Sequence, residues 1–340
     1  MIECIFTLDY EIYGNGEGSL KELVYEPAEK LRAIFEKWNA RFETFVEVAE
    51  LEMIEAKDTD KAMDLVKHQL RDFYREGFEL GLHLHPQWYN ARYENRKWWL
   101  DYNEYNLCAL PKYRIKEIVD RSIEYLRNLL GLAGFVPFSF RAGNWLFQPT
   151  CIVAKSLIDK GIKVDSSVFK GGIQHQYRLD YRSALKNGYC WPFMDDVNVP
   201  DPKGNLIEFP IYTKMTPLWK LPTTKRVGLQ RKVPTRTRSG KERLLRILDF
   251  LRLCHPLKFD FCRLNLRELT HMLGKEIQRD QKDPDLFRPV IAIGHTKDLI
   301  DFETVDSLLG YLRRKEIPIS TFRGIYHKCN FTNHQIKSRA

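Results

Sequence analysis

The sequence reads Glu79-Leu80-Gly81-Leu82-His83-Leu84-His85-Pro86-Gln87-Trp88 where a buried strand is expected to give way to a loop. Side chains two residues apart share one face of a strand, so we expect His83 and His85 to point the same way. Two imidazoles at the end of a strand suit a bound metal ion. A hydrogen-bonded pair of histidines at the mouth of a barrel is the alternative interpretation.

Around this stretch, strand-like and helix-like segments alternate along the chain. The strand-like segments are residues 2–8, 42–48, 78–84, 138–141, 163–168, 206–211, 290–293 and 318–321. Segments with helical periodicity are residues 27–39, 59–75, 115–130, 149–160, 266–278 and 302–314. This alternation predicts an α/β fold in which helices cover a parallel sheet, with enough repeats to close the sheet into a barrel.

The composition is that of a soluble globular protein, with 44% apolar and 29% charged residues in a chain of 340. The first strand begins at Ile2 with no basic and apolar leader before it, and no apolar run is long enough to span a bilayer. The seven cysteines are scattered, which predicts reduced thiols. We therefore expect a cytoplasmic protein. The formal net charge of +9 indicates an anionic partner.

One segment, about residues 213–246, departs from the alternating pattern and predicts a basic, partly mobile loop inserted in the barrel. Its charge is interpreted either as a solvated face or as a surface for phosphate or an anionic membrane. We expect a barrel over residues 1–325 that carries this insert, and a C-terminal tail over residues 326–340. From Lys214 to Arg246 the insert has a single acidic residue, Glu242. Its basic residues are Lys214, Lys220, Lys225, Arg226, Arg231, Lys232, Arg236, Arg238, Lys241, Arg243 and Arg246.

Two acidic side chains follow the first strand, in the sequence Asp9-Tyr10-Glu11. The alternation of a strand places both carboxylates on the same face. Such a pair at the mouth of a barrel is either a metal and base site or a capped turn. The active sites of parallel barrels lie at the carboxyl ends of the strands, which gives weight to the first interpretation.

Three further strands also end in polar side chains. Arg141 ends an apolar strand, and Asp9 is the natural carboxylate to neutralise it if both are buried. Asp165 and His295 follow later strands. A single polar residue after a strand is usually a satisfied turn residue. Five successive strand ends that carry such groups together indicate hydrolysis assisted by a metal.

In this order the motifs resemble those of the polysaccharide deacetylase (NodB-homology) superfamily, carbohydrate esterase family 4. The first motif of that family, Thr-Phe-Asp-Asp, is similar to Thr7-Leu8-Asp9-Tyr10-Glu11, in which the second acid is displaced by one position. The second to fifth motifs resemble residues 81–88, 141–145, 165–167 and 294–295. The resemblance runs to about residue 314 and is nearest to the WalW-like branch. It implies a distorted (β/α)7-type barrel of the glycoside hydrolase and deacetylase kind.

The resemblance implies a hydrolase that removes an N-acetyl or other N-acyl group from an amino sugar in a polysaccharide or glycan precursor. Its cofactor would be a divalent metal ion, zinc in the first place, held by Glu11, His83 and His85. The family usually supplies a second metal histidine four residues after the first, where this chain has Gln87. Either His85 replaces that ligand or Gln87 binds through its carbonyl oxygen.

The resemblance also implies roles for the remaining polar residues. Asp9 would be the general base that accepts a proton from water, and Arg141 would orient Asp9 and keep it ionised. His295 would protonate the departing amine from the opposite side of the scissile bond. Asp165 would orient His295 and keep it cationic.

An aromatic loop follows the two histidines and indicates a sugar-binding surface. Flat aromatic faces suit the apolar face of a pyranose, and amide side chains suit its hydroxyl groups. Burial of these aromatic residues in a small core of the loop is the alternative. The side chains expected to contact substrate are Trp88, Trp98, Trp99 and Tyr102, with Asn144 and Trp145 from the third motif.

The predicted location narrows the substrate, because a cytoplasmic enzyme does not meet finished cell-wall polymer. We expect a carbohydrate that is lipid-linked or nucleotide-linked, and the basic insert predicts a peripheral position at an anionic inner membrane face. Two alternatives stay open: an N-deformylase of a lipid-linked amino sugar, and a non-catalytic carbohydrate-binding relative, which Gln87 favours. A nucleic-acid partner is not expected, because only the basic insert supports it.

Overall fold

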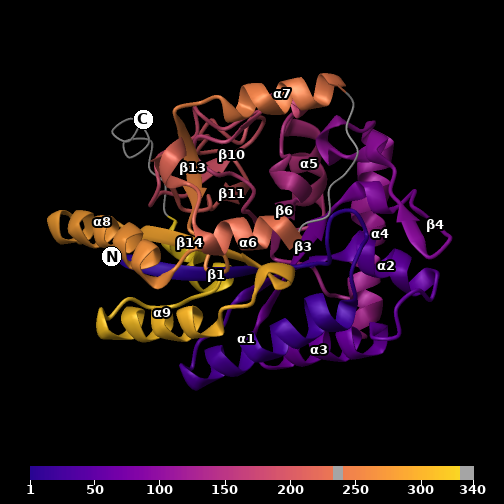
Figure 1. Ribbon diagram of the computed structural model, residues 1–340, viewed down its shortest axis with the longest axis horizontal. Coiled ribbons are helices and arrows are strands. Elements are labelled where there is room, and N and C mark those ends of the chain that lie inside the picture. The colour runs from indigo at the N-terminus through magenta and orange to yellow at the C-terminus, as the bar shows by residue number, and fades with distance from the viewer. Residues whose placement is uncertain (233–239, 330–340) are drawn as a thin grey trace.

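The computed structural model describes residues 1–232 and 240–329 as an α/β structure built on one large sheet (Figure 1). Neighbouring strands of this sheet are parallel, except that β10 and β11 are antiparallel. Seven of the eight predicted strands belong to it, and the eighth, at residues 318–321, is only a bridge between Cys4 and Ile319. The order of the strands is β10 (Trp191–Phe193), β11 (Leu206–Glu208), β7 (Val164–Asp165), β6 (Ser139–Ala142), β3 (Glu79–Leu84), β2 (Glu43–Glu47), β1 (Ile2–Tyr10) and β14 (Arg288–His295).

The sheet is curled, and later chain segments connect its two ends. Beyond β11, Ile211 forms a bridge with Ile291 of β14, and the backbone N–H of Tyr212 donates to the carbonyl of Ile291 at 3.0 Å. A second bridge joins Asp260 to Ile293. All nine residues of β1 are buried, as is typical of a parallel strand covered on both sides. The distorted barrel predicted from the sequence is thus confirmed.

Helices cover the outer face of the sheet and bury apolar stripes against it, as Leu31 and Phe35 of α1 illustrate. In Figure 1, α1, α3 and α9 lie along the lower side, whereas α2 and α4 lie at the right. Helix α2 follows β2 directly and was not predicted. The helices of the barrel are α1 (Glu26–Lys37), α2 (Val48–Ala56), α3 (Met63–Arg75), α4 (Lys112–Leu130), α5 (Cys151–Asp159), α8 (Leu266–Lys282), α9 (Phe302–Arg314) and α10 (Phe322–Ile325).

Within its described residues, the basic insert forms a strand and two helices, so the prediction of a loop was wrong for this part. Its first strand, β12 (Thr213–Pro217), is antiparallel to β13 (Cys254–Lys258), and α6 (Thr224–Lys232) and α7 (Gly240–Phe250) lie between them. Pro217 ends β12, Pro222 precedes α6 and Gly240 begins α7, where they do not prevent helix formation, and α6 tolerates Gly228 in its interior. The predicted basic residues Arg236 and Arg238, and most of the predicted tail, lie outside the described residues. Outside the insert, the described residues also form two small hairpins. These are β4 (Arg92–Glu94) with β5 (Lys97–Trp99), and β8 (Ile173–Gln174) with β9 (Leu179–Asp180).

Cys190 and Cys329 form a disulfide across 139 residues of sequence. The prediction of reduced thiols was therefore wrong for this pair, because spacing along the chain does not reveal which distant cysteines meet. Disulfides persist in oxidising compartments, so the cytoplasmic location, which stays a prediction, loses one of its supports. Among the helices of residues 1–232 and 240–329, none combines the length and apolar character needed to cross a bilayer.

Candidate active site

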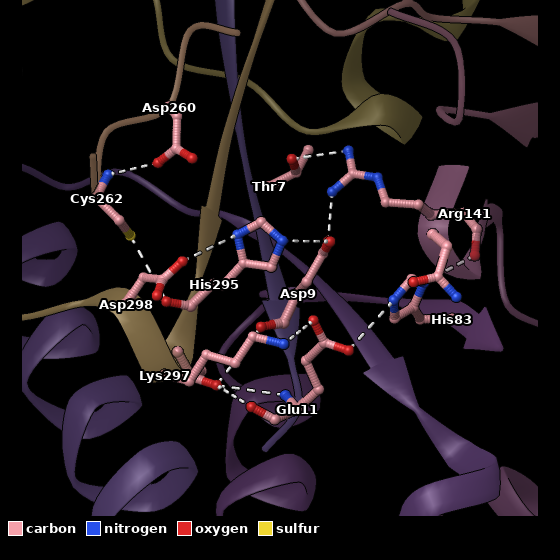
Figure 2. Close-up of polar contacts among 12 residues, drawn as sticks. Thr7, Asp9, Glu11, His83, Arg141, Asp260, Cys262, His295, Lys297 and Asp298 are labelled. Atoms are coloured by element: carbon pink, nitrogen blue, oxygen red, sulfur yellow. Dashed lines mark hydrogen bonds and ion pairs between the residues drawn. The ribbon is translucent and has the colours of Figure 1, made fainter. Parts of the chain in front are cut away.

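The carboxyl ends of neighbouring strands bring charged side chains together at one edge of the sheet (Figure 2). In the parallel register, Asp9 of β1 is paired with His295 of β14, and His83 of β3 is paired with Arg141 of β6. Strand β2 lies between β1 and β3 and connects the two pairs. The topology therefore assembles four of the predicted residues from distant parts of the sequence.

Arg141 is fully buried and fixes the carboxylate of Asp9. Its Nη1 donates to Asp9 Oδ1 at 2.5 Å, and its Nη2 donates to Thr7 Oγ1 at 2.9 Å. Its Nε donates to the carbonyl of Ser166 at 2.9 Å. Burial raises the pKa of Asp9, but the charge of Arg141, followed by those of two histidines, outweighs burial and holds this pKa below its usual range. Asp9 is thus an ionised carboxylate of fixed orientation, as a general base requires.

His295 lies against Asp9. Its Nε2 is 3.4 Å from Asp9 Oδ2, and its Nδ1 is 4.0 Å from Asp298 Oδ2. Burial lowers the pKa of His295 by more than the neighbouring carboxylates raise it. The two side chains are therefore neighbours, and their placement on opposite sides of a scissile bond stays a prediction. Ligand atoms of Asp9, Glu11 and His295 also lie within 4.8 Å of one another.

Asp165 supports the loop after β6 and does not contact His295. Its carboxylate accepts hydrogen bonds from the hydroxyl (2.8 Å) and the backbone N–H (3.2 Å) of Ser167. The same hydroxyl oxygen accepts a bond from the N–H of Ala142 at 2.8 Å. The prediction that Asp165 orients His295 was therefore wrong. The carboxylate that faces His295 Nδ1 is Asp298, because the turn after β14 returns it toward the ring.

Glu11, His83 and His85 converge on one point. Glu11 Oε2 lies 3.7 Å from His83 Nε2 and 3.2 Å from His85 Nε2, and Glu11 Oε1 accepts a bond from Lys297 Nζ at 2.7 Å. Burial raises the pKa of Glu11, but Lys297 and both imidazoles outweigh burial and hold this pKa well below its usual range. Two imidazole nitrogens and one carboxylate form a donor set that zinc takes in catalytic sites.

Two observations indicate that these residues fit a divalent ion. The Nδ1 of His83 lies 2.8 Å from the carbonyl of Arg141, to which it donates, so that its Nε2 faces Glu11. In addition, Glu47 Oε2 is buried and has no hydrogen-bond partner in the described part of the chain. Ligand atoms of Glu11, Glu47, His83 and His85 lie within 4.8 Å of one another. A cation at this point would compensate the unpaired carboxylate oxygen.

The Nδ1 of His85 is contacted by two amide side chains. Gln87 Nε2 lies at 3.1 Å and Asn144 Nδ2 at 3.2 Å from it. Gln87 Oε1 is buried and without a hydrogen-bond partner among the described residues. Turning the Gln87 and Asn144 amides by half a rotation would place both side-chain oxygens against an Nδ1–H, which leaves His85 Nε2 unprotonated and able to bind a metal. This geometry favours His85 as the ligand and Gln87 as the residue that positions it.

Four charged residues of the site were not predicted from the sequence, and Asp298 beside His295 is the first of them. Glu47 ends β2 and is paired in register with His83, so an acid in an apolar strand next to the histidine strand was the available signal. Lys297 lies two residues after His295, the end of the last motif, and the sequence around it contains no pattern that indicates a site residue. Lys258 ends β13, beyond the insert, and its Nζ lies 3.7 Å from the centroid of the Trp145 ring. Burial lowers the pKa of Lys258 to about 7. Only tertiary packing brings it here.

Two adjoining cavities lie near the site, and the second of them reaches it through Asn144. The first, here called the aromatic cavity, has a volume of about 760 Å³ and is lined by Tyr93, Trp98, Trp99 and Tyr102 among others. The second, here called the basic cavity, has a volume of about 520 Å³, and its lining includes Tyr102, Asn144, Arg246 and Arg252. The two cavities share Tyr102 and Asn15, and Asn144 connects the basic cavity to His85.

The predicted sugar-contacting tryptophans divide into two groups. Trp98 and Trp99 line the aromatic cavity, and the Trp99 side chain is 58% exposed. Trp88 is 1% exposed and packs edge-on against Trp98, with ring centroids 5.1 Å apart. The prediction that Trp88 contacts substrate was wrong, because this ring belongs to the core of the loop. Trp145 packs beside His295, with ring centroids 6.1 Å apart.

No family model matches the sequence, and no curated protein matches it. Solved structures do match, over nearly the whole chain. A "putative polysaccharide deacetylase" from Mycobacterium smegmatis is 14% identical with a TM-score of 0.53, and the match covers 96% of this chain and 90% of that one. For a "probable polysaccharide deacetylase" from Pseudomonas aeruginosa PAO1, the identity is 11%, the TM-score 0.50, and the coverages 97% and 93%.

A third match is a GH57 branching enzyme from Thermococcus kodakaraensis, with 10% identity, a TM-score of 0.56, and coverages of 97% and 72%. At such identities the likeness establishes the fold: the chain has the barrel that solved polysaccharide deacetylases have, as its motifs predicted. Because a branching enzyme shares this fold, the chemistry has to be argued from the residues of the site.

Proposed function

We propose that the protein is a metal-dependent hydrolase that removes an N-acyl group from an amino sugar of a glycan or glycan precursor. The observation that carries this proposal is the ionised Asp9, held by Arg141 beside the converging side chains of Glu11, His83 and His85. Amide hydrolysis needs a base for water, a Lewis acid for the carbonyl and an acid for the leaving amine. The barrel shared with polysaccharide deacetylases supports the same conclusion.

In this proposal Glu11, His83 and His85 hold the metal, and the nearby Glu47 supplies further negative charge. Zinc fits the donor set best. When bound, the ion acidifies water and polarises the acyl carbonyl. The other residues have to supply the proton transfers and bind the sugar.

Asp9 accepts the proton of the attacking water, because Arg141 keeps its carboxylate ionised and aimed into the site. His295 Nε2 lies 3.4 Å away and receives that proton, since burial keeps its pKa low enough for the ring to be neutral beforehand. The resulting imidazolium then protonates the departing amine nitrogen. Asp298 beside Nδ1 stabilises the charge on the ring during the transfer.

The two cavities support an amino-sugar substrate that carries a phosphate link. Trp99 and Tyr102 offer aromatic faces for pyranose rings in the aromatic cavity. Arg246 and Arg252 line the basic cavity together with one acid, Asp249, and suit the diphosphate of a lipid-linked or nucleotide-linked sugar.

The direct test is release of the acyl group from N-acetyl and N-formyl amino sugars, free and diphosphate-linked. The Asp9→Asn variant should lower kcat by about a hundredfold or more while it retains the metal. Release of formate in preference to acetate would reassign the protein as an N-deformylase. Sugar binding without release of either acid by the metal-loaded wild type would leave a carbohydrate-binding relative, and equal rates for Asp9→Asn and wild type would exclude the proposed base.

A further inference from the structure

Helix α7 turns its polar side toward the protein. Glu242 accepts a hydrogen bond from Gln176 Nε2 at 2.8 Å, and Asp249 accepts one from the backbone N–H of His175 at 3.3 Å. Glu242 and Asp249 are seven residues apart, so both lie on one face of the helix. This face packs on the loop around β8 and β9.

The opposite side of α7 presents an apolar stripe to solvent. Leu244, Ile247, Leu248 and Leu251 have the i, i+3, i+4, i+7 spacing of a single helix face, and they are 57%, 54%, 48% and 69% exposed. Surface helices of soluble proteins usually have the reverse orientation, with the apolar stripe facing the core. In Figure 1, α7 lies along the upper edge of the molecule with no element above it.

Neighbouring residues extend this apolar surface. The N–H of Leu218 donates to the carbonyl of Leu253 at 3.0 Å, which places the turn after β12 beside the end of α7. In these two segments Trp219 is 71% exposed and Leu253 is 80% exposed. We call Leu244, Ile247, Leu248, Leu251, Leu253 and Trp219 the α7 surface.

We propose that the α7 surface binds the interfacial region of an anionic lipid bilayer. An amphipathic helix with cations beside an apolar stripe is suited to this region, and tryptophan is enriched there. Arg243 and Arg246 are exposed on α7, and Lys220 adjoins Trp219. A second copy of the chain on the same surface would bring these like charges together, whereas anionic headgroups neutralise them.

Bilayer binding would also affect access to the site. The helix that carries the apolar stripe contributes Arg246, Asp249 and Phe250 to the lining of the basic cavity, which Asn144 also lines. A bilayer on the α7 surface therefore borders a cavity next to the proposed catalytic residues. This consequence, access for a lipid-linked substrate, rests on the proposed function, whereas bilayer binding itself does not.

The test is flotation of the full-length protein with vesicles of phosphatidylcholine and phosphatidylglycerol in equal parts, compared with phosphatidylcholine alone. Wild type should bind the anionic vesicles and bind neutral ones much more weakly. The triple variant Leu244→Asn/Ile247→Asn/Leu248→Asn should reduce binding to the anionic vesicles by about a hundredfold, because it makes the centre of the inserting helix face polar. Its unfolding transition should match that of wild type.

The matched control is the triple variant Leu65→Asn/Tyr113→Asn/Leu132→Asn, whose side chains are also exposed but lie on or beside α3 and α4. It should bind anionic vesicles as wild type does. Absence of wild-type binding, or equal loss in both triple variants, would overturn the proposal. So would a wild-type dimer that the α7 variant alone converts to monomer, since the surface would then belong to a second copy. The α7 variant should still hydrolyse a soluble amino sugar at the wild-type rate. This second measurement separates a failure of bilayer binding from a failure of the proposed function.

Discussion

Replacing Arg141 by methionine should lower the free energy of unfolding by about 3–5 kcal/mol, because it removes one partner of a buried ion pair. The guanidinium of Arg141 is 0% exposed and donates to Asp9, Thr7 and Ser166. Methionine keeps much of the volume but leaves the Asp9 carboxylate, 2% exposed, without its main counter-charge. Most of the loss should therefore come from the uncompensated charge of Asp9.

A double-mutant cycle with Asp9→Asn tests this origin. The cost of the double variant should be lower than the sum of the single costs by about 1–3 kcal/mol, since an amide tolerates the loss of Arg141 better than a carboxylate does. Chemical denaturation followed by circular dichroism measures all four proteins. Arg288→Met is the control, because this buried arginine pairs with Asp280 and Asp283, which are partly solvent-exposed, and should cost less. Additive effects of the two site substitutions would refute the reasoning.

Three further predictions concern other parts of the molecule. Burial and the neighbouring Glu79 raise the pKa of Glu43 well above its usual range. The protonated Glu43 side chain therefore stabilises the fold at low pH, and this contribution is lost as pH rises from the unfolded pKa of about 4.3 toward the folded pKa. In thermal melts, Glu43→Gln should raise Tm at about pH 8 but not at about pH 4. Equal shifts of Tm at both pH values would contradict this prediction. Gln87→Ala should weaken metal binding by about tenfold to a hundredfold in titrations against a competing chelator, and unchanged affinity would exclude its positioning role. Trp99→Ala should raise KM for a glycan by about tenfold at unchanged Tm, whereas Trp88→Ala, at a buried position, should lower the free energy of unfolding by about 3–5 kcal/mol. A raised KM in the Trp88 variant and a loss of stability in the Trp99 variant would show that Trp88 binds the glycan and Trp99 supports the fold.

The strand ends that carry the site could be predicted from the sequence because each combines an apolar run with an abrupt polar group. Asp9, His83, Arg141 and His295 each follow such a run, and parallel strands place their carboxyl ends at one edge. The order of the motifs then predicted the barrel. The alternation of strands and helices identified seven strands of the main sheet for the same reason.

The parts that could not be predicted depend on how side chains are turned and packed in space. Asp165 has the same local pattern as Asp9, yet its carboxylate binds Ser167, and the carboxylate that faces His295 Nδ1 is Asp298. Trp88 looks like a sugar-binding residue in the sequence, and only its packing shows that it is buried. The stripe of α7 could have been found from its spacing, but which way that stripe faces is decided by tertiary structure.

The central claim is that Glu11, His83 and His85 form a metal site, and the most direct test is metal content. Elemental mass spectrometry of tag-free protein purified without chelator should find near-stoichiometric divalent metal in wild type and in a His68→Ala control, whose histidine is exposed on α3. His83→Ala should lose the metal. Absence of metal from wild type, even after titration with zinc, or equal metal content in wild type and His83→Ala, would contradict the account.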